Sequence, residues 1–358
     1  MKRYFLLGIG MVGILLLFSC SPAKFYEKEI FFVNPRDHIT LAGTLSIPYA
    51  NHPVPAVILI HGSGPLNRDL DMNAQADLFK DLSDELASNG IAVLRYDKRG
   101  VGASQGNYIP YDMEHFMEDG LSGIDFLKSY PEMEFQSIGA LGISQGGILT
   151  PLMAVNSDDI DFIILMAGAG VEAYELFYTS QLALAKAAGL QAGKEEKLRD
   201  LYDRFWAIIS KPHLNVQERA MGLKYLKSLW EYIDMESRKD FGFLNENIEF
   251  LFDQMYHHPN VLKFFKYQPA ETVSQVTCPV LALNGDKDVQ VVAEINLPAL
   301  ELALKNGNCP SYQIVKLKNH NHLFQVCETG KVAEYKYIEG TVSNESLSII
   351  KEWIHQLP

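Results

Sequence analysis

A five-residue segment near the middle of the chain has the composition expected around an enzymatic nucleophile. Residues 142–146 read Gly-Ile-Ser-Gln-Gly, which places Ser144 between two glycines at the G-x-S-x-G spacing. An apolar run, 137–143, leads into the segment, and helix-forming residues follow it. A sharp strand-to-helix turn of this kind exposes the serine hydroxyl above a sheet, and its small flanking residues let other backbone approach. The segment therefore predicts a nucleophilic serine at position 144.

A serine hydroxyl is a weak nucleophile until a base removes its proton, and the usual base is a histidine oriented by a carboxylate. Asp286 and Asp288 follow one apolar run, and His320 and His322 follow the last one. Nucleophile, acid, base is a known chain order for such triads. Because active sites of parallel sheets form at the carboxyl ends of the strands, we expect one acid and one base to lie near Ser144. Spacing alone leaves open which member of each couple acts.

Acyl transfer also needs hydrogen-bond donors for the oxygen on which negative charge develops. Residues 61–64, His-Gly-Ser-Gly, end an earlier apolar run, at a place where a loop donates a backbone N–H to such an oxygen. We expect the N–H of Ser63 to be the first donor, with that of Gly64 as the alternative. The N–H of Gln145, directly after the nucleophile, is the expected second donor.

The elements that must position these residues alternate between strands and helices. Two runs of strand composition precede residue 49, and the pattern then predicts strands at 56–60, 91–96, 137–143, 161–166, 279–284 and 312–317. Helices are expected between them, at 76–89, 113–129, 146–156, 293–305 and 346–356. Such alternation predicts an α/β fold with a mostly parallel central sheet flanked by helices.

The alternation stops in the segment 171–270, which contains no convincing strand and reads as several amphipathic helices. We therefore expect a core domain made of residues 25–170 and 271–358, with an all-helical insertion, 171–270, before the last two strands.

Composition excludes several classes of protein. The formal net charge of -13 argues against a nucleic-acid partner, because phosphate binding needs a basic surface. No histidine and cysteine cluster has zinc-site spacing, and no metal or other cofactor is expected. Of the cysteines, Cys278 opens an apolar run, so we expect it to be buried, whereas pairing between Cys309 and Cys327 stays open.

The N-terminus resembles an export signal. Lys2 and Arg3 precede an uncharged apolar run, 4–18, which is short for a membrane span but typical of a signal peptide. The run ends Leu-Phe-Ser-Cys, similar to the cleavage box of bacterial lipoproteins. We expect residues 1–19 to be removed and Cys20 to carry lipid, anchoring an exported protein to the cell envelope. A plain secretory signal and an uncleaved anchor are the alternatives.

Beyond these single motifs, the chain from about Thr40 onward resembles the α/β-hydrolase superfamily, and within it exported bacterial carboxylesterases. The resemblance is carried by the segments 61–69, 95–104, 142–146, 283–291 and 321–325.

The resemblance implies that Asp288 is the acid and His322 the base, while Asp286 orients its loop and His320 faces away. It also implies a helical cap over the site, an ion pair of Arg68 with Asp69 that braces the oxyanion loop, and a structural loop at 97–104.

These residues predict a serine hydrolase that cleaves carboxylic esters through an acyl-enzyme. A peptidase or amidase, or a thioesterase or acyltransferase, would use the same groups. A binding lipoprotein without catalysis is a further alternative, disfavoured because the Ser, Asp and His order is intact. The expected partner is a small-molecule or glycan-borne ester, and the lipid anchor would be the chain's only contact with a membrane.

Overall fold

The computed structural model describes residues 24–71, 77–109, 112–232, 248–257 and 259–358. The expected signal peptide and Cys20 lie outside these residues. The strands are β1 Phe25–Asn34, β2 Ile39–Pro48, β3 Ala56–Ile60, β4 Ala92–Tyr96, β5 Ile138–Ile143, β6 Phe162–Met166, β7 Val280–Gly285 and β8 Tyr312–Leu317.

Helices lie between most of these strands. They are α1 Leu78–Ser88, α2 Met113–Lys128, α3 Gln145–Val155, α4 Ala173–Ala187, α5 Glu195–Ile209, α6 Val216–Trp230, α8 Ile248–His257, α9 Pro259–Lys266, α10 Pro269–Ser274, α11 Ala293–Asn306, the 3₁₀ helix η1 Val332–Tyr337 and α12 Asn344–His355.

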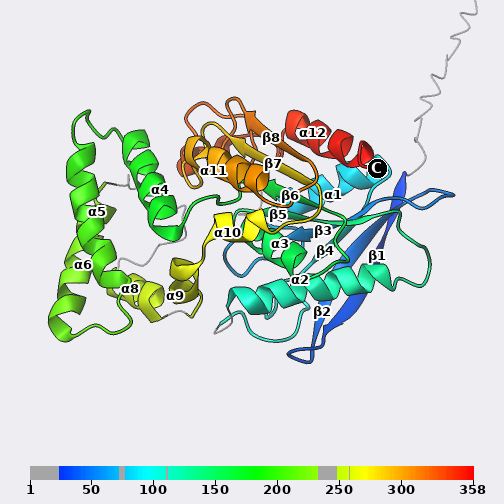
Figure 1. The fold of residues 1–358 in the computed structure, drawn as a ribbon, viewed down its shortest axis with the longest axis horizontal. Helices are drawn as coiled ribbons and strands as arrows, with labels where there is room; N and C mark the ends of the chain where they lie inside the picture. The colour runs from blue at the N-terminus through cyan, green and yellow to red at the C-terminus, as the bar shows by residue number, and fades with distance from the viewer. Residues whose placement is uncertain (1–23, 72–76, 110–111, 233–247, 258) are drawn as a thin grey trace, which may run out of the picture.

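The strands form one eight-stranded sheet in the order β1-β2-β4-β3-β5-β6-β7-β8 (Figure 1). From β4 to β8 every neighbouring pair is parallel, whereas β1 and β2 form an antiparallel hairpin, and β2 is also antiparallel to β4. The predicted mostly parallel α/β fold is therefore confirmed, with an antiparallel extension at one edge.

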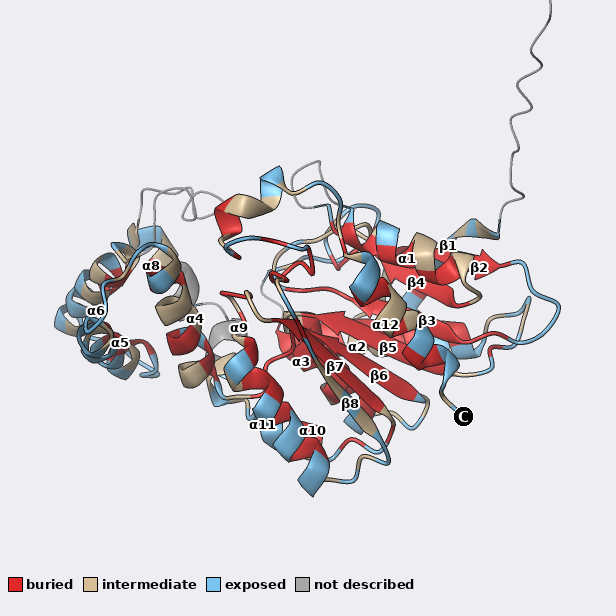
Figure 2. Cartoon of the chain, turned by 90° about the horizontal axis from the view of Figure 1, so that it is seen from above, coloured by how far each residue is buried: buried red, intermediate tan, exposed pale blue. Residues whose placement is uncertain are grey.

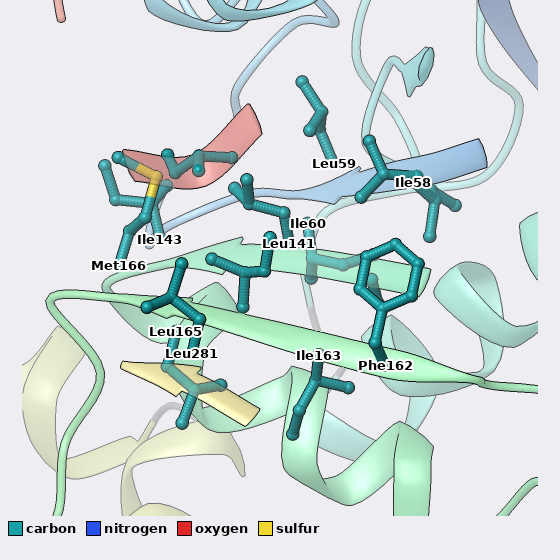
Figure 3. Packing of buried hydrophobic residues seen from close by; sticks show 14 of the residues in the cluster. Ile58, Leu59, Ile60, Leu141, Ile143, Phe162, Ile163, Leu165, Met166 and Leu281 are labelled. Atoms are coloured by element: carbon teal, nitrogen blue, oxygen red, sulfur yellow. The ribbon is translucent and has the colours of Figure 1, made fainter. Parts of the chain in front are cut away.

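The sheet has helices on both of its faces. Helices α1 and α12 pack together on one face, and α2, α3 and α10 lie on the other (Figure 1). The central strands β3 to β7 are buried along their whole length, as continuous apolar runs predict for a sheet covered on both sides (Figure 2). Neighbouring strands interlock through apolar side chains such as Ile60, Leu141, Leu165 and Leu281 (Figure 3).

Between β6 and β7 the described residues form helices only, namely α4, α5, α6, α8, α9 and the short α10. Helices α4 to α8 lie to one side of the sheet domain (Figure 1) and have a core of their own, which includes Tyr202, Phe205, Leu226 and Phe252. The predicted helical insertion before the last two strands is thus present. Among the described residues, no helix is both long and apolar enough to span a membrane.

Candidate active site

Ser144 sits in a strained turn between β5 and α3. Its backbone has φ 55° and ψ -116°, outside the conformations that a non-glycine residue normally adopts. The flanking glycines make the turn possible: a Cβ at Gly142 would lie 2.1 Å from the carbonyl oxygen of Gly146, and one at Gly146 would lie 2.0 Å from that of Ile60. Ser144 N–H donates to the carbonyl of Met166 on the neighbouring strand, at 2.9 Å. The turn therefore fixes the serine at the carboxyl edge of the sheet.

Helix α3 begins directly after the serine, at Gln145. The N–H groups of a first helical turn have no acceptor within the helix and carry partial positive charge. Two residues further on, the N–H of Gly147 already donates to the carbonyl of Ser144 at 2.9 Å. Gln145 is the first residue of the helix, so we expect its N–H to be available beside the serine.

Asp288 and His322 meet across the loops that follow β7 and β8. His322 Nδ1–H donates to Asp288 Oδ2 at 2.7 Å, and both side chains are buried. The second carboxylate oxygen of Asp288 accepts the N–H groups of Gln290 and Val291, at 2.8 and 2.9 Å. These bonds orient the carboxylate and set the tautomer of the imidazole, which leaves Nε2 unprotonated when the ring is neutral. Among the described residues no hydrogen bond joins His322 to Ser144.

The two alternative residues, Asp286 and His320, form hydrogen bonds with other groups. Asp286 Oδ1 accepts the N–H of Asn319 at 2.6 Å, which ties the loop after β7 to the loop after β8. His320 Nδ1–H donates to the carbonyl of Lys318 at 2.8 Å, and its Nε2 lies 2.7 Å from the hydroxyl of Ser343, the N-cap of α12. Asp286 and His320 thus hold the loops together, while Asp288 and His322 are paired with each other.

Residues of η1 and α4 also contact the loop that carries Asp288. Tyr335 packs beside it and accepts a hydrogen bond from Gln290 Nε2 at 3.3 Å. Burial, reinforced by the charge of Asp288, raises the pKa of Tyr335, so its phenol stays neutral. From the helical insertion, Ser180 on α4 donates to the carbonyl of Val289 at 3.1 Å. The insertion therefore contacts the loop that carries the acid.

The loop after β3 lies against the serine. A Cβ at Gly62 would be 3.4 Å from Ser144 Cβ, in ordinary contact. The N–H of Gly64 donates to the hydroxyl of Tyr108 at 3.1 Å, and no acceptor is found among the described residues for the N–H of Ser63. His61 anchors the start of the loop, since its buried ring donates through Nε2 to the carbonyl of Asn67 at 3.0 Å. Burial lowers the pKa of His61 to about 3, which keeps this ring neutral.

Lys98 lies in the segment 97–104, which was expected to be a structural loop, and no role of its own was predicted for it. It follows β4, and its buried Nζ donates to the carbonyls of Gly62 and Gly64, at 2.5 and 3.1 Å. Its position could have indicated a role, because residues directly after a buried parallel strand lie at the edge of the sheet where active sites form.

The expected ion pair between Arg68 and Asp69 is wrong, because each residue binds a different partner. Arg68 binds Asp97 through two side-chain hydrogen bonds at 2.9 and 3.2 Å, and Asp69 pairs with Arg95. Each residue reaches a partner at the end of the adjacent strand β4, because that strand brings opposite charges to the loop. The two residues brace the loop separately.

The remaining cysteines are free thiols. Cys309 Sγ lies 3.3 Å from the carbonyl oxygen of Cys278 and 3.1 Å from that of Ser311, either of which its thiol proton can reach, and Cys309 and Cys327 are both free in this structure. Burial raises the pKa of Cys278 to about 12 and that of Cys327 to about 11, which disfavours their reactive thiolate forms.

Esterases are among the known proteins to which this chain is similar. Esterase EstD of Thermotoga maritima is 26% identical over 338 residues, which covers 93% of this chain and 68% of that protein. Among solved structures, the esterase Pf2001 of Pyrococcus furiosus has a TM-score of 0.56 at 15% identity, covering 93% of this chain and 91% of that one. The acylaminoacyl peptidase of Pyrococcus horikoshii has a TM-score of 0.55 at 16% identity, covering 93% and 42%.

The structural likenesses establish the fold, which is that of the α/β-hydrolases. The family model described as X-Pro dipeptidyl-peptidase (S15 family) matches residues 37–307, well over half of the chain. The chain therefore belongs to the X-Pro dipeptidyl-peptidase (S15) family, which its α/β-hydrolase fold accommodates.

Proposed function

We propose that this protein hydrolyses carboxylic esters through a covalent acyl-enzyme on Ser144. The observation that carries the proposal is the buried 2.7 Å hydrogen bond between Asp288 and His322. It orients an imidazole at the same edge of the sheet as a serine held in a strained turn. A bond between the base and the nucleophile is often long before substrate binds, so the unbonded serine is compatible with this role.

In the proposed reaction, His322 Nε2 accepts the hydroxyl proton as Ser144 Oγ attacks the ester carbonyl. The N–H groups of Ser63 and Gln145 stabilise the oxygen that becomes negative. The tetrahedral intermediate collapses, and the leaving alcohol takes the proton from His322. Water then attacks the acyl-enzyme with the same residue as base and frees the acid and Ser144. Asp288 holds the imidazole tautomer and stabilises its charged form.

We propose esters rather than peptides as substrates for two reasons. The sequence similarity to a curated esterase covers most of the chain. Recognition of a peptide amino terminus would need carboxylates free to bind an ammonium group, and two acidic residues of the insertion already have partners. Glu175 lies 3.6 Å from Arg199, and Glu172 accepts a hydrogen bond from Gln268 at 3.4 Å. The family's description still makes X-Pro peptides the required comparison substrate.

The test is labelling of the chain lacking residues 1–20 with a fluorophosphonate, beside Ser144→Ala and the exposed cap variant Ser210→Ala. We expect the wild type and Ser210→Ala to react and Ser144→Ala to stay unlabelled. Turnover of p-nitrophenyl esters and of an X-Pro p-nitroanilide then separates esterase from peptidase. No labelling of the wild type would remove the proposed nucleophile, and faster anilide turnover would make the enzyme a peptidase.

We also propose that residues 171–270 act as a cap domain on a core of residues 25–170 and 271–358, and that the protein is exported with lipid on Cys20. The apolar N-terminal run and the box before Cys20 support the second proposal. Metabolic labelling with a fatty-acid analogue in a bacterial host tests it. Incorporation that persists in Cys20→Ala would contradict this attachment site.

A further inference from the structure

Lys98 is a buried cation whose contacts lie on the loop beside the serine. Its side chain comes from the end of β4, the residue is only 2% exposed, and Nζ donates to the carbonyls of Gly62 and Gly64. The rings of Tyr108 and Phe116 flank Nζ, with centroids at 5.5 and 4.9 Å. Within the described part of the chain, no carboxylate forms an ion pair with it. Carbonyl dipoles and ring faces therefore replace the water around this charge.

The bond to Gly62 determines where the next N–H points. The carbonyl of Gly62 and the N–H of Ser63 belong to one planar trans peptide, so the two groups point in opposite directions. Holding the carbonyl toward Lys98 turns the N–H of Ser63 away from it. Both backbone polar groups of Gly64 are already bonded, the N–H to Tyr108 and the carbonyl to Lys98. The N–H of Ser63 is thus the donor that these contacts leave available in residues 63–64.

The same bond strengthens that donor. In its ammonium form Lys98 is a charged donor, and such a donor on a carbonyl polarises the whole peptide unit strongly in a water-poor site. We propose that Lys98 is a positioning residue for ester hydrolysis, which directs and polarises the Ser63 N–H toward the oxygen that becomes negative in the transition state. The inference rests on the proposed function, because it assigns Lys98 to the oxyanion site of that reaction.

Activity per folded molecule separates this role from a structural one. Burial lowers the pKa of Lys98 to about 7, so keeping the ammonium charged in this position opposes folding. Met removes that cost but leaves the carbonyls of Gly62 and Gly64 without this donor, so stability alone does not report the role. A residue kept only for the fold would lose stability when it is replaced and leave kcat per folded molecule unchanged.

The experiment compares Lys98→Met with Lys80→Met, whose lysine pairs with Asp84 on the surface of α1. Complete loss of one oxyanion donor costs about 10²–10³-fold in kcat, so misdirecting one should cost about 10–100-fold. We expect that fall in kcat for p-nitrophenyl butyrate, with KM within about threefold of wild type, because the interaction forms in the transition state. Ki for a trifluoromethyl ketone, which forms a tetrahedral adduct, should rise by the same factor as kcat/KM falls. Lys80→Met should match the wild type.

Lys98→Gln is the second variant, and it carries the test if Lys98→Met does not fold. Its amide can still donate a hydrogen bond but carries no charge, and we expect a smaller fall in kcat, about 3–10-fold, with the same parallel rise in Ki. Unchanged kcat in soluble Lys98→Met, or a lower Tm with unchanged kcat per folded molecule, would overturn the inference. If Lys98→Met cannot be obtained folded, unchanged kcat in Lys98→Gln does the same. A wild type that neither hydrolyses esters nor is labelled at Ser144 would instead overturn the proposed function itself.

Discussion

The two sides of the candidate site are held by different forces. Beside β3 and β4 the loops are fixed by buried charges, of which Arg99 and Asp119 form the most enclosed pair, joined by two hydrogen bonds at 2.7 Å. Beside β7 and β8 the loops are fixed mainly by bonds to backbone groups, and the buried pair is Asp288 with His322. Removing a partner from the first pair should therefore affect folding, whereas removing one from the second should affect chemistry.

The largest expected effect comes from Asp288→Asn. The amide still accepts the N–H groups of Gln290 and Val291, but it no longer fixes the His322 tautomer. We expect kcat for an activated ester to fall on the order of 10⁴-fold, as for similar changes in serine protease triads. Tm should stay within a few degrees of wild type.

Asp286→Asn is the matched comparison, because its carboxylate holds Asn319 and contacts neither His322 nor Ser144 in the described structure. Its kcat should stay within about tenfold of wild type, which is the loss we expect from a loosened loop. If the two variants lost activity equally, the assignment of roles in this couple would be wrong.

The second effect falls on stability. Asp119→Ala removes the carboxylate that accepts two hydrogen bonds from the buried guanidinium of Arg99. Breaking a buried pair from one side costs about 3–5 kcal/mol in the free energy of unfolding, measured by urea denaturation. Asp125→Ala, at an exposed position of the same helix, should cost less than about 0.5 kcal/mol. Equal losses in the two variants would show that the buried charges do not hold this side of the site.

The smallest expected effect is a loss of folding stability at low pH, at the contact between Asp112 and Lys263. Burial opposes ionisation of Asp112, but bonds from Lys263 on α9 and from His115 outweigh it and lower the pKa to about 2. Since the folded pKa lies below the unfolded one, this stabilisation is complete above about pH 4 and is lost as pH falls toward 2.

The variant Asp112→Asn isolates that contribution, because asparagine caps a helix as well as aspartate does. Between pH 5 and pH 3 the Tm of the wild type should fall by more than that of the variant. Parallel curves for the two proteins would show that the contact with α9 adds no acid-sensitive stability.

Much of the fold could be predicted from the sequence, because buried parallel strands leave a local pattern. The run 56–60 matches β3 residue for residue, since a continuous apolar run leaves little ambiguity. The run 312–317 also matches β8 residue for residue, although Gln313 and Lys316 interrupt its apolar residues. The short helices α10 and η1 were not predicted, because six residues are too few to show helical periodicity.

The candidate site could be predicted from the sequence only in part, because its contacts are not local in the chain. The order of Ser144, Asp288 and His322 indicates a serine hydrolase, and each is expected at a strand end from local signals. Which groups a cation meets across the sheet depends on strand order, so the partners of Arg68 and Lys98 could not be assigned from the sequence. Their partners are 29 to 36 residues away along the chain and adjacent only across the sheet.

The conformation of Ser144 has a consequence for how such a chain evolves. Positive φ with a side chain present costs roughly 1–3 kcal/mol, and glycine would relieve much of that cost. Selection for a stable fold alone would therefore favour glycine at this position and lose the hydroxyl. Selection for the proposed reactivity of Ser144 would keep the serine at this position, with the surrounding sheet offsetting the strain. Descendants released from that selection should drift first at this residue, while β5 and α3 around it remain intact.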